Sequence, residues 1–465
     1  MSAPFPSLLF RSALTGAAAL ALGACAGVDQ DAAFADLRTA VGDRIGHELV
    51  WRRDAATDAA VTAQIDALLA SELSFDGAVQ LALLNNRELQ ARYAELGIAN
   101  ADLVQAGLIS NPVLDIMIRP TTNPSEGSIL EFGLAQNVLD LLQRPARQKI
   151  ARAELEQTRS AVAAAAVQTV GAVRAAYVKA VGARNAEAVV AQIAAATEAG
   201  WELAQRFHAA GNISDLQLAE ERALHEDNVV LMDSAALEAA ETREELAELL
   251  GVPADALKLP AQLPGLPATD APPADAETVA LDRRLDMRAA RSALSARVEA
   301  LKLASDFRLW QEFALKVDAE REPDGQWAVG PGLELALPLF DQGKPAVARA
   351  AAELLQAENE LRAREAKVRA EVRTALAKVG AARRIAERFR TAILPLKQDI
   401  VRLKQEKYNF MLIGVFDVLV AKREETAAYL DYVEAVRDYW LARAALADAM
   451  GGMAVETAPN PGATS

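Results

Sequence analysis

Few residues of this 465-residue chain have the types and spacing that catalysis or metal binding requires. The three histidines, His47, His208 and His225, are scattered and show no metal-ligand spacing. The chain has no glycine-rich phosphate loop, no nucleophile elbow and no paired carboxylates in a catalytic context. The sequence therefore predicts neither an enzyme nor a protein that uses a cofactor or a bound metal.

The only cysteine, Cys25, closes a short apolar segment at the N-terminus. The run of residues 13–22 is too short to span a bilayer as a helix. The sequence Leu22-Gly23-Ala24-Cys25 resembles the bacterial lipobox, in which the cysteine becomes the lipidated first residue of the mature chain. We therefore expect residues 1–24 to be a lipoprotein signal peptide and Cys25 to carry lipid. Ala26 at the next position implies sorting to the outer membrane of a Gram-negative bacterium.

The composition favours long helices over a compact mixed fold. Alanine, leucine, glutamate and arginine abound, and only 5% of the residues are aromatic. The formal net charge of −15 argues against a nucleic-acid partner, which would require a basic face. Either solubility or an acidic conduit for cations explains this charge, and the sequence leaves both interpretations open.

Residues 327–339 alternate between two kinds of side chain, apart from Pro331 and Pro338. The odd positions are apolar and the even positions are small or acidic: Trp327, Val329, Leu333, Leu335, Leu337 and Leu339 against Ala328, Gly330, Gly332, Glu334 and Ala336. This pattern predicts a strand with one lipid-type face and one face toward a watery lumen. Similar patterns predict two β-hairpins, at 113–138 and 309–339, with Glu131, Glu312 and Glu334 facing the lumen.

Long helical stretches flank each predicted hairpin. The first helix is predicted to start at Ser74 or Asp76, either of which can cap it, and to run to Ser110. Residues 146–252 contain no proline and reverse only near residues 210–215. This predicts two helices of about 60 and 35 residues, and the longer would be about 90 Å long.

Apolar stripes on the long helices are expected to be buried: Val170, Val173, Tyr177 and Val181 in the first half and Val368, Val372, Leu376 and Val379 in the second. Pro395 is expected to kink the helix of the second half locally. No run beyond the N-terminal segment is apolar for long enough to form a transmembrane helix, so further crossings of a membrane are expected from strands.

The second half repeats the order of elements of the first, at an offset near 200 residues. Phe340-Asp341 corresponds to Leu139-Asp140 at the junction of strand and helix, and Asp417 corresponds to Asp215 at the helical reversal. We interpret this as an internal duplication of helix, β-hairpin, long helix, turn and helix. The predicted segments are a lipidated tether with short helices at 25–72, a first repeat at 73–251 with its tip at 210–216, a proline-rich linker at 252–275, a second repeat at 276–450 with its tip at 411–418, and a disordered tail at 451–465.

Four strands of lipid-facing type cannot close a barrel, because known membrane barrels begin at about eight strands. An open sheet edge in hydrocarbon leaves backbone groups unpaired, at several kcal/mol for each group. Several copies must therefore pool their strands: two copies would supply about eight, and three copies about 12. Helices with alanine-rich stripes on more than one face are expected to close into a cylinder.

With these features in place, the sequence resembles the TolC-like outer-membrane efflux proteins from Leu73 to about Gly452. The resemblance is carried by residues 81–89 (LALLNNREL), by the junctions Val138-Leu139-Asp140 and 338–341, and by the two tips, in this order and duplicated. The second tip, with the sequence MLIGVFDVL, is more hydrophobic than the commoner family form.

The resemblance implies a mainly α fold class with membrane β-hairpins. A homotrimer would share a 12-stranded β-barrel in outer-membrane lipid and a long-helix α-barrel in the periplasm. It implies a channel that passively conducts substrates to the exterior, docked to a periplasmic adaptor (membrane fusion) protein and an inner-membrane pump.

The tips are the candidate gate and adaptor contact on this reading, through Gly211, Asn212, Ser214, Asp215, Leu216, Ile413, Gly414, Phe416 and Asp417. In a trimer, the two aspartates would place six carboxylates around a narrow opening and attract cations. Both aspartates could instead be helix N-caps. The apolar residues Leu412, Ile413, Val415 and Phe416 would be either adaptor contacts or packed between adjacent tip helices.

Two other functions remain open at this stage. The same fold would serve as the outer-membrane duct of a type I protein secretion system. A coiled-coil lipoprotein spacer without a pore is the other alternative, although a spacer does not need hairpins with lipid-type faces. The sequence does not identify the substrate as a drug, a metal ion or a polypeptide, because the inner-membrane partner largely makes that choice.

Overall fold

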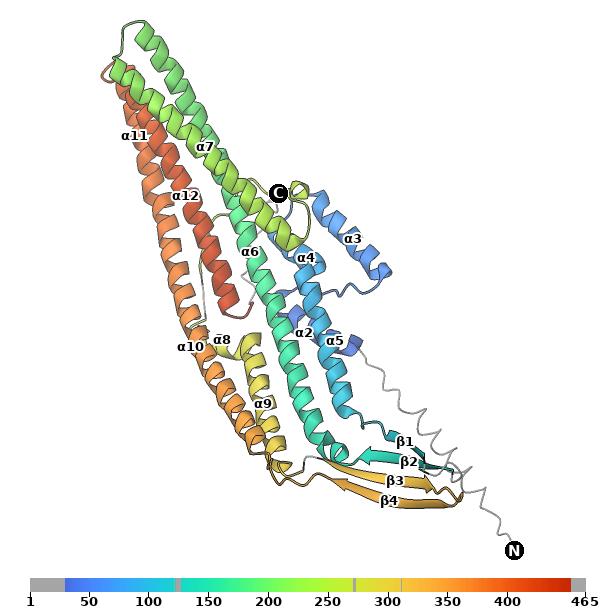
Figure 1. Cartoon of the computed structure of the whole chain (residues 1–465). Coiled ribbons are helices and arrows are strands. Elements are labelled where there is room, and N and C mark those ends of the chain that lie inside the picture. The colour runs from blue at the N-terminus through green and yellow to red at the C-terminus, as the bar shows by residue number, and fades with distance from the viewer. Residues whose placement is uncertain (1–29, 121, 123–126, 271–272, 311, 453–465) are drawn as a thin grey trace. The chain divides into compact units, whose positions relative to one another are not determined.

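The computed structural model describes residues 30–120, 122, 127–270, 273–310 and 312–452, whose elements Figure 1 labels. The predicted signal peptide, Cys25 and all but the first two residues of the predicted C-terminal tail lie outside this part of the chain. The chain divides into two compact units. Unit 1 contains Ala94–Arg159, Ala289–Leu361 and the described residues up to Asp36, and unit 2 contains Leu37–Tyr93, Ser160–Arg288 and the residues from Arg362 on. Each unit therefore takes segments from both halves of the sequence.

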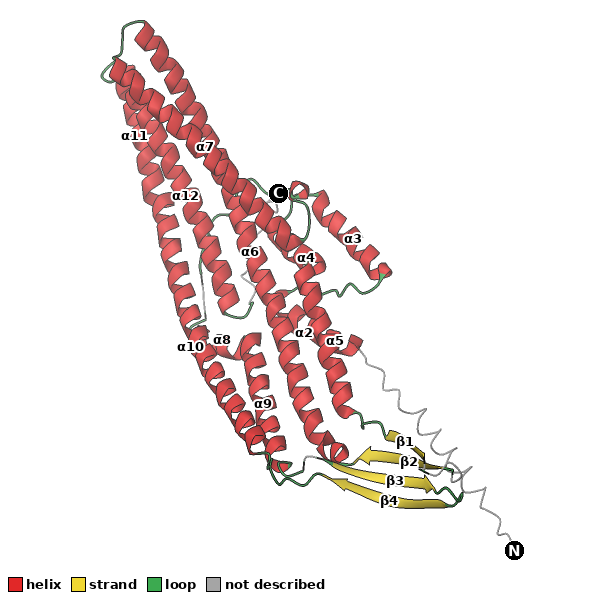
Figure 2. Ribbon diagram, viewed as in Figure 1, coloured by secondary structure: helices red, strands yellow, loops and turns green. Residues whose placement is uncertain are grey.

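Unit 1 holds a sheet of four antiparallel strands in the order β1-β2-β3-β4 (Figure 2). The strands are β1 (Val113–Pro120), β2 (Ser128–Asn137), β3 (Phe313–Arg321) and β4 (Trp327–Leu335). β2 pairs with β3 along residues 130–137 and 314–321, so the two predicted hairpins form one sheet. The predicted bounds 309–339 are too wide, because residues 307–309 form a turn and residues 336–339 are irregular.

Four helices precede β1, and the last two differ from the prediction. They are α2 (Gln30–Ile45), α3 (Ala55–Ala70), α4 (Phe75–Asn85) and α5 (Arg87–Gly107). Ser74 caps α4, because its side chain accepts a hydrogen bond from the Gly77 N–H at 3.0 Å. The single helix predicted as far as Ser110 is wrong: the backbone is extended at Asn86, and the helix starts again one residue later.

The break at Asn86 turns two amide side chains onto the end of α7 (Asp215–Leu250). Asn86 accepts from the Leu89 N–H and donates to the Leu249 carbonyl at 2.9 Å. Asn85 donates to the carbonyls of Leu250 and Gly251 at 3.0 and 2.7 Å. The last carbonyls of a helix have no partner within the helix, so these bonds explain why the chain breaks here.

The second half contains a similar break. Helices α8 (Ala276–Arg283) and α9 (Leu285–Asp306) are separated by Arg284, whose backbone is extended. The element order of residues 276–449 is otherwise that of residues 75–250: two helices, two strands, a long helix and a returning helix.

The long helices differ in their continuity. Helix α6 (Leu139–Ala209) starts before Pro145, so the predicted start after this proline is wrong; the Asn137 side chain accepts from the Asp140 N–H and caps it early. The corresponding helix of the second half is interrupted: α10 (Lys344–Arg388) passes through a π-turn, η2 (Phe389–Ile393), into α11 (Leu394–Asn409). The π-turn ends two residues before Pro395, where a local kink was predicted. Helix α12 (Val415–Ala449) completes the chain that the structure describes.

One stretch of α6 is long and apolar enough to cross a membrane, by length and composition alone, which corrects the expectation that no such run exists. More than half of that stretch is buried within the chain. A buried, alanine-rich core helix has the same composition, so this stretch does not by itself assign a membrane span.

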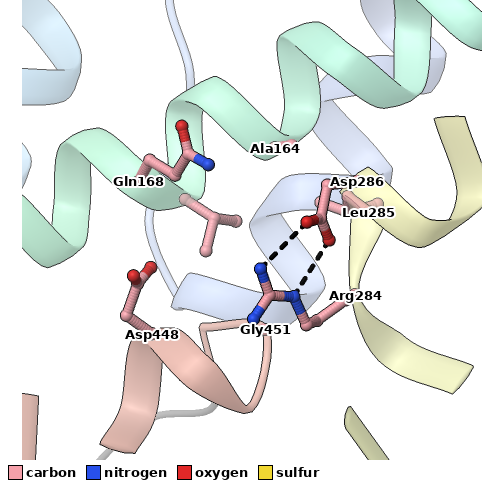
Figure 3. Close-up of a pocket in the computed structure, with 8 residues that line it drawn as sticks. Ala164, Gln168, Arg284, Leu285, Asp286, Asp448 and Gly451 are labelled. Atoms are coloured by element: carbon pink, nitrogen blue, oxygen red, sulfur yellow. Dashed lines mark hydrogen bonds and ion pairs between the residues drawn. The ribbon is translucent and has the colours of Figure 1, made fainter. Parts of the chain in front are cut away.

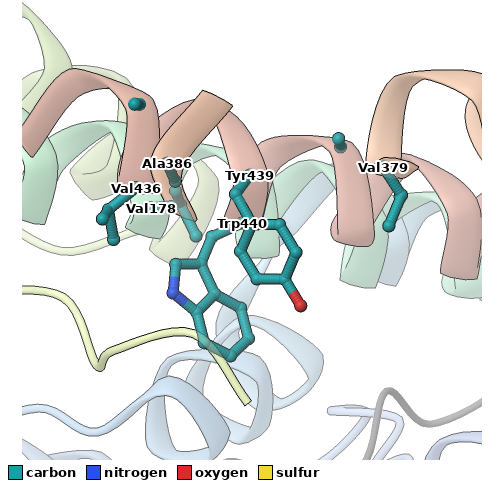
Figure 4. Close-up of a cluster of buried hydrophobic side chains, with 8 residues drawn as sticks. Val178, Val379, Ala386, Val436, Tyr439 and Trp440 are labelled. Carbon is teal, nitrogen blue, oxygen red and sulfur yellow. The ribbon is translucent and has the colours of Figure 1, made fainter. Parts of the chain in front are cut away.

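The core of unit 2 confirms most of the predicted stripes. Val170, Val173, Tyr177 and Val181 of α6 are buried, as are Val368, Val372 and Val379 of α10, whereas Leu376 is half-buried. A cluster around Tyr439 and Trp440 of α12 joins α6 and α10 to α12 (Figure 4). Small residues fill the remaining contacts, which allows the helices to approach closely.

The proline-rich linker follows the helices of unit 2 in a defined path. The Trp440 indole N–H donates to the Pro264 carbonyl at 2.8 Å. Asp270 of the linker accepts from the Tyr439 hydroxyl at 2.7 Å and from the Arg383 guanidinium at 2.9 Å. These bonds fasten the linker to α10 and α12.

A small polar cavity lies in unit 2 at the α8–α9 break (Figure 3). It is lined by Ala164, Val167, Gln168, Arg284, Leu285, Asp286, Asp448 and Gly451. The Arg284 guanidinium pairs with Asp286 at 2.9 Å and with Glu371 at 2.5 Å. Asp448, in contrast, has no hydrogen-bond partner for its carboxylate among the described residues.

The Asp448 carboxylate lies against α6 although part of its side chain is open to solvent. A Cβ on Gly171 would come within 3.1 Å of its Oδ1, so a larger residue at position 171 would push the Asp448 side chain away by a few tenths of an ångström. Burial raises the pKa of Asp448, and the neighbouring carboxylates of Glu371 and Asp286 add to this effect against the opposing charges of Arg284 and Arg174.

We expect Asp448→Asn to raise the melting temperature by about 1–2 °C near pH 7. A folded-state pKa above the unfolded value means that the ionised carboxylate costs stability at neutral pH, and that this cost disappears as the pH falls below the unfolded pKa of about 3.9. Calorimetry between about pH 4 and pH 8 checks this. Asp438→Asn, at a half-exposed position of the same helix, is the control and should show no such gain. A lower melting temperature for Asp448→Asn at neutral pH would contradict the assignment.

Candidate functional site

One face of the sheet in unit 1 carries nearly all of the charged strand residues. The register places Asp115, Glu131, Lys316, Asp318, Glu320 and Glu334 on this face, with Arg119 at its end. The Arg119 guanidinium bridges Glu131 at 2.8 Å and Glu320 at 3.3 Å, and Lys316 pairs with Glu334. Two of the three predicted lumen glutamates are therefore neutralised by cations. The third, Glu312, lies just before β3, where its carbonyl accepts from the Ala336 N–H.

Two aspartates on this face were missed at the sequence level. Asp115 and Asp318 lie opposite each other across Gly133, and Gly330 lies beyond Asp318 in the same row. Neither aspartate makes an ion pair within the described part of the chain. A Cβ on Gly133 or Gly332 would lie 3.0 Å from a carboxylate oxygen of Asp318. Alternation of side chains assigns both aspartates to this face, but only the β2–β3 register places them in one row.

The opposite face of the sheet is apolar and open. Six of its aliphatic side chains are each more than half exposed in the single chain: Leu114, Ile116, Ile118, Val317, Val329 and Leu333. Phe132 and Trp327 stack on it, with ring centroids 6.1 Å apart. A contiguous apolar surface of this kind marks contact with lipid or with another protein. β1 and β4 are the outer strands, and neither has a second partner strand in the described chain.

The first helical tip, between α6 and α7, is a Schellman turn. Gly211 has a φ of 74°, its N–H donates to the His208 carbonyl, and the Asn212 N–H donates to the Phe207 carbonyl at 2.8 Å. Ser214 caps α7 in a capping box with Gln217.

Asp215 and Leu216 follow as the first two residues of α7, and both are exposed. The Asp215 carboxylate is almost fully solvent-exposed and lies 2.7 Å from Nε2 of His208. Asp215 therefore contacts the end of α6 and does not cap α7.

The second tip, between α11 and α12, has the same backbone with a different sequence. The Met411 N–H donates to the Tyr408 carbonyl at 2.8 Å, and the Leu412 N–H donates to the Lys407 carbonyl at 3.0 Å. Met411 occupies the left-handed position with a φ of 58°, and no other non-glycine residue of the described chain has a positive φ. Gly414 takes the N-cap position, and its N–H donates to Asp417 Oδ2 at 3.1 Å.

The predicted register of Asp215 with Asp417 is wrong. Met411 matches Gly211 and Gly414 matches Ser214 in hydrogen bonding, an offset of 200 residues, whereas the two aspartates are 202 apart. Asp215 is the first residue of its helix, and Asp417 is the third. Asp417 stabilises the start of α12, but neither aspartate is an N-cap. The interpretation of both aspartates as N-caps is therefore wrong, and the acidic opening stays a prediction.

The apolar side chains of the second tip divide into two groups. Phe416 is half-buried against Phe207 of α6, with ring centroids 6.0 Å apart, and Ile413 and Val415 are also half-buried. The exposed group is Phe410, Met411 and Leu412, with exposed fractions of 77%, 93% and 70%. Met411, in the left-handed region, lies in the middle of this exposed group, and no local pattern predicted that conformation.

A partly buried ion pair links the helices that return from the two tips. The Arg423 guanidinium of α12 lies 3.2 Å from the Glu221 carboxylate of α7, and their side chains are only 19% and 14% exposed. No group of three or more potential metal ligands occurs in the described part of the chain. The described tips consist of packed apolar side chains, an exposed apolar group and a few carboxylates.

The candidate site is thus a two-faced sheet with open outer strands, joined in sequence to long helical hairpins. Comparison of the sequence with protein-family models and with curated proteins finds no match. Comparison of the fold with solved structures, in contrast, finds similar proteins. The Campylobacter jejuni outer membrane channel CmeC is 17% identical to this chain, with 81% of this chain and 85% of CmeC covered and a TM-score of 0.70.

Two further structures give the same result. The outer membrane protein VceC of Vibrio cholerae is 17% identical, with 82% of this chain and 96% of VceC covered and a TM-score of 0.67. The Neisseria gonorrhoeae outer membrane channel MtrE, in its open state, is 19% identical, with 81% and 89% covered and a TM-score of 0.65. The chain has the fold of the TolC-like outer-membrane channels, and the resemblance inferred from its sequence is confirmed at the level of fold.

We expect Met411→Gly to stabilise the second tip, because a non-glycine residue in the left-handed region costs about 1 kcal/mol. Hydrogen exchange of the Leu412 amide, which donates to Lys407, should slow by about two- to fivefold. Gly211→Ala is the matched variant of the first tip, and it should accelerate exchange of the Asn212 amide. Unchanged exchange in both variants would contradict the strain assigned to Met411.

Proposed function

We propose that this chain is the outer-membrane channel component of a tripartite efflux system. It passively conducts substrates that an inner-membrane pump and a periplasmic adaptor deliver, and it releases them outside the cell. The fold shared with outer-membrane channels supports this proposal. Lipidation at Cys25, in the N-terminal segment, would anchor the chain to the outer membrane.

The observation that carries the proposal is the two-faced sheet with two open edges. Its apolar face suits lipid and its charged face suits water, but four strands are too few to enclose a lumen. The unpaired edges of β1 and β4 require partner strands in hydrocarbon. A homotrimer pairs β4 of each copy with β1 of the next, supplies about 12 strands and leaves no edge.

The tips supply the gate and the adaptor contact in this proposal. Phe410, Met411 and Leu412 form an exposed apolar group that suits a helical partner protein. Asp215 and Asp417 remain candidates for an acidic opening, although Asp215 is the first residue of its helix and Asp417 is the third. The Arg423–Glu221 ion pair joins α7 to α12. An opening of the tips that separates these two helices must break it.

The alternatives from the sequence differ in how well they fit. A coiled-coil spacer has no use for an open apolar sheet face opposite a row of aspartates. A duct for secreted polypeptides uses the same architecture, and its separation from small-molecule efflux lies in the inner-membrane partner. A catalytic role is disfavoured, because the relatives in fold are channels.

The first experiment is to measure the protein mass of the detergent-extracted particle by light scattering. Three chains in each particle are expected, because three copies close the sheet. A Cys25→Ala variant with a signal peptide that is cleaved without lipidation lacks the lipid anchor. Its particle should stay in the membrane, since the barrel itself holds it there. A monomer that leaves the membrane without its lipid would overturn the channel and favour the spacer.

Asp115 and Asp318 are expected to set the charge selectivity of the barrel lumen, because neither forms an ion pair in the described part of the sheet. The double variant Asp115→Asn with Asp318→Asn should lower the cation-to-anion permeability ratio in planar bilayers by about two- to fivefold. A control that removes two carboxylates outside the sheet, Asp438→Asn with Asp431→Asn, should leave the ratio unchanged. Equal ratios for the three proteins would show that this row does not face the conducted ions.

A further inference from the structure

Helix α7 of unit 2 carries an apolar stripe that is exposed in the described chain. The stripe, called the α7 stripe below, consists of residues at intervals of seven, which share one helix face: Leu216, Ala223, Val230 and Leu237. Its three larger side chains are each more than half exposed, and Ala223 is exposed as well. An exposed stripe with this spacing is typical of a helix that packs against another helix.

A second exposed stripe lies on the helix that approaches the other tip. Ile385 near the end of α10 and Leu396 and Leu403 of α11 form it, and they are called the α10–α11 stripe below. Their side chains are between 49% and 61% exposed. All three belong to unit 2, as does the α7 stripe.

Contacts with α12 place the tip-side ends of the two stripes at one level. Glu221 of α7 and Lys397 of α11 form ion pairs with consecutive residues of α12, at 3.2 and 2.7 Å. From these positions toward the tips, Leu216 lies five residues beyond Glu221 and Leu403 lies six residues beyond Lys397. A difference of one residue is only about 1.5 Å along a helix, so Leu216 and Leu403 lie at the same level.

The other ends of the stripes match in the same way. Glu238 of α7 pairs with Arg437 of α12 at 3.6 Å. Ala386 of α10 is buried in the cluster that contains the preceding residue of α12. The adjacent residues Leu237 and Ile385 therefore lie at one level too.

The charges around the two stripes are complementary. Helix α7 has eleven acidic residues and two arginines, whereas residues 384–407 contain seven basic and three acidic residues. Four exposed residues beside Leu237 and Ile385 form no ion pair within the described chain: Asp233 and Glu241 on α7, and Arg384 and Arg388 on α10. Opposite charges along two helices favour one pairing over others.

We propose that the α7 stripe packs against the α10–α11 stripe of a second copy of this chain. The two surfaces differ, so the contact is heterologous, and a ring closes when every copy uses both. Rotation about an axis along the helices preserves the levels, so Leu237 meets Ile385 of the next copy and Leu216 meets Leu403. The number of copies in the ring rests on the proposed function, whereas the pairing of the stripes does not.

The test is disulfide cross-linking of the full-length, detergent-extracted particle. Leu237→Cys with Ile385→Cys should join neighbouring copies under mild oxidation and give linked chains in a non-reducing gel, as should Leu216→Cys with Leu403→Cys. Leu216→Cys with Ile385→Cys is the matched control, because its positions lie about 27 Å apart along the helices and should give about fivefold less product or lower. Leu237→Cys alone should give none, which also excludes a contribution from Cys25, the only native cysteine.

Three results would overturn the pairing: no product from either matched pair in a particle of three chains, equal product from the mismatched pair, or linkage of the stripes only to a different protein. Linked pairs in a particle of two chains would support the pairing and contradict the trimer. The particle mass from light scattering therefore separates failure of the pairing from failure of the channel proposal.

Discussion

The backbone ladder between β2 and β3 is the interaction on which the sheet depends. It joins residues 130–137 to residues 314–321, so hydrogen bonds link segments from the two halves of the chain. Because side chains alternate along a strand, a shift of one residue in this ladder would move Leu134 and Val317 to opposite faces. The register in the structure keeps one face apolar and gathers Asp115, Gly133 and Asp318 in one row of the other. A sheet with such faces suits the boundary between lipid and water that the proposed function gives it.

Unit 2 depends on a different constraint, the satisfaction of helix ends within a helical core. The breaks at Asn86 and Arg284 each direct polar side chains toward groups that would otherwise lack partners. In the first half, neutral amides serve the last carbonyls of α7. In the second, a guanidinium collects two carboxylates beside a polar cavity. The same break between two helices thus supports a network of neutral amides in one half and a network of charged groups in the other. Beside the charged network lies the Asp448 carboxylate, which has no hydrogen-bond partner among the described residues.

The two tips share one backbone conformation but present different side chains to solvent. Both turns make the same pair of hydrogen bonds, and both place one residue in the left-handed region. Glycine accepts that conformation without strain in the first tip, which leaves the turn polar. Methionine accepts it at a cost in the second, and the result is an exposed apolar group beside packed aromatic rings. Residual strain in a surface turn is more easily explained by contact than by stability, which is consistent with a docking role.

The sequence by itself determined the kinds of element and most of their places. Period-two alternation predicted the strands, apolar stripes predicted the faces that α6 and α10 bury, and Gly211 with Ser214 predicted the first reversal. These are local signals, since they depend only on side-chain spacing and on the geometry of single residues. The tertiary structure decided the features that depend on long-range contacts. These are the helix break whose side chains donate to the end of α7, the row that Asp115 and Asp318 share, and the register of the two tips. Asn86 breaks a helix because carbonyls more than 160 residues away need a donor, and no local pattern contains that information.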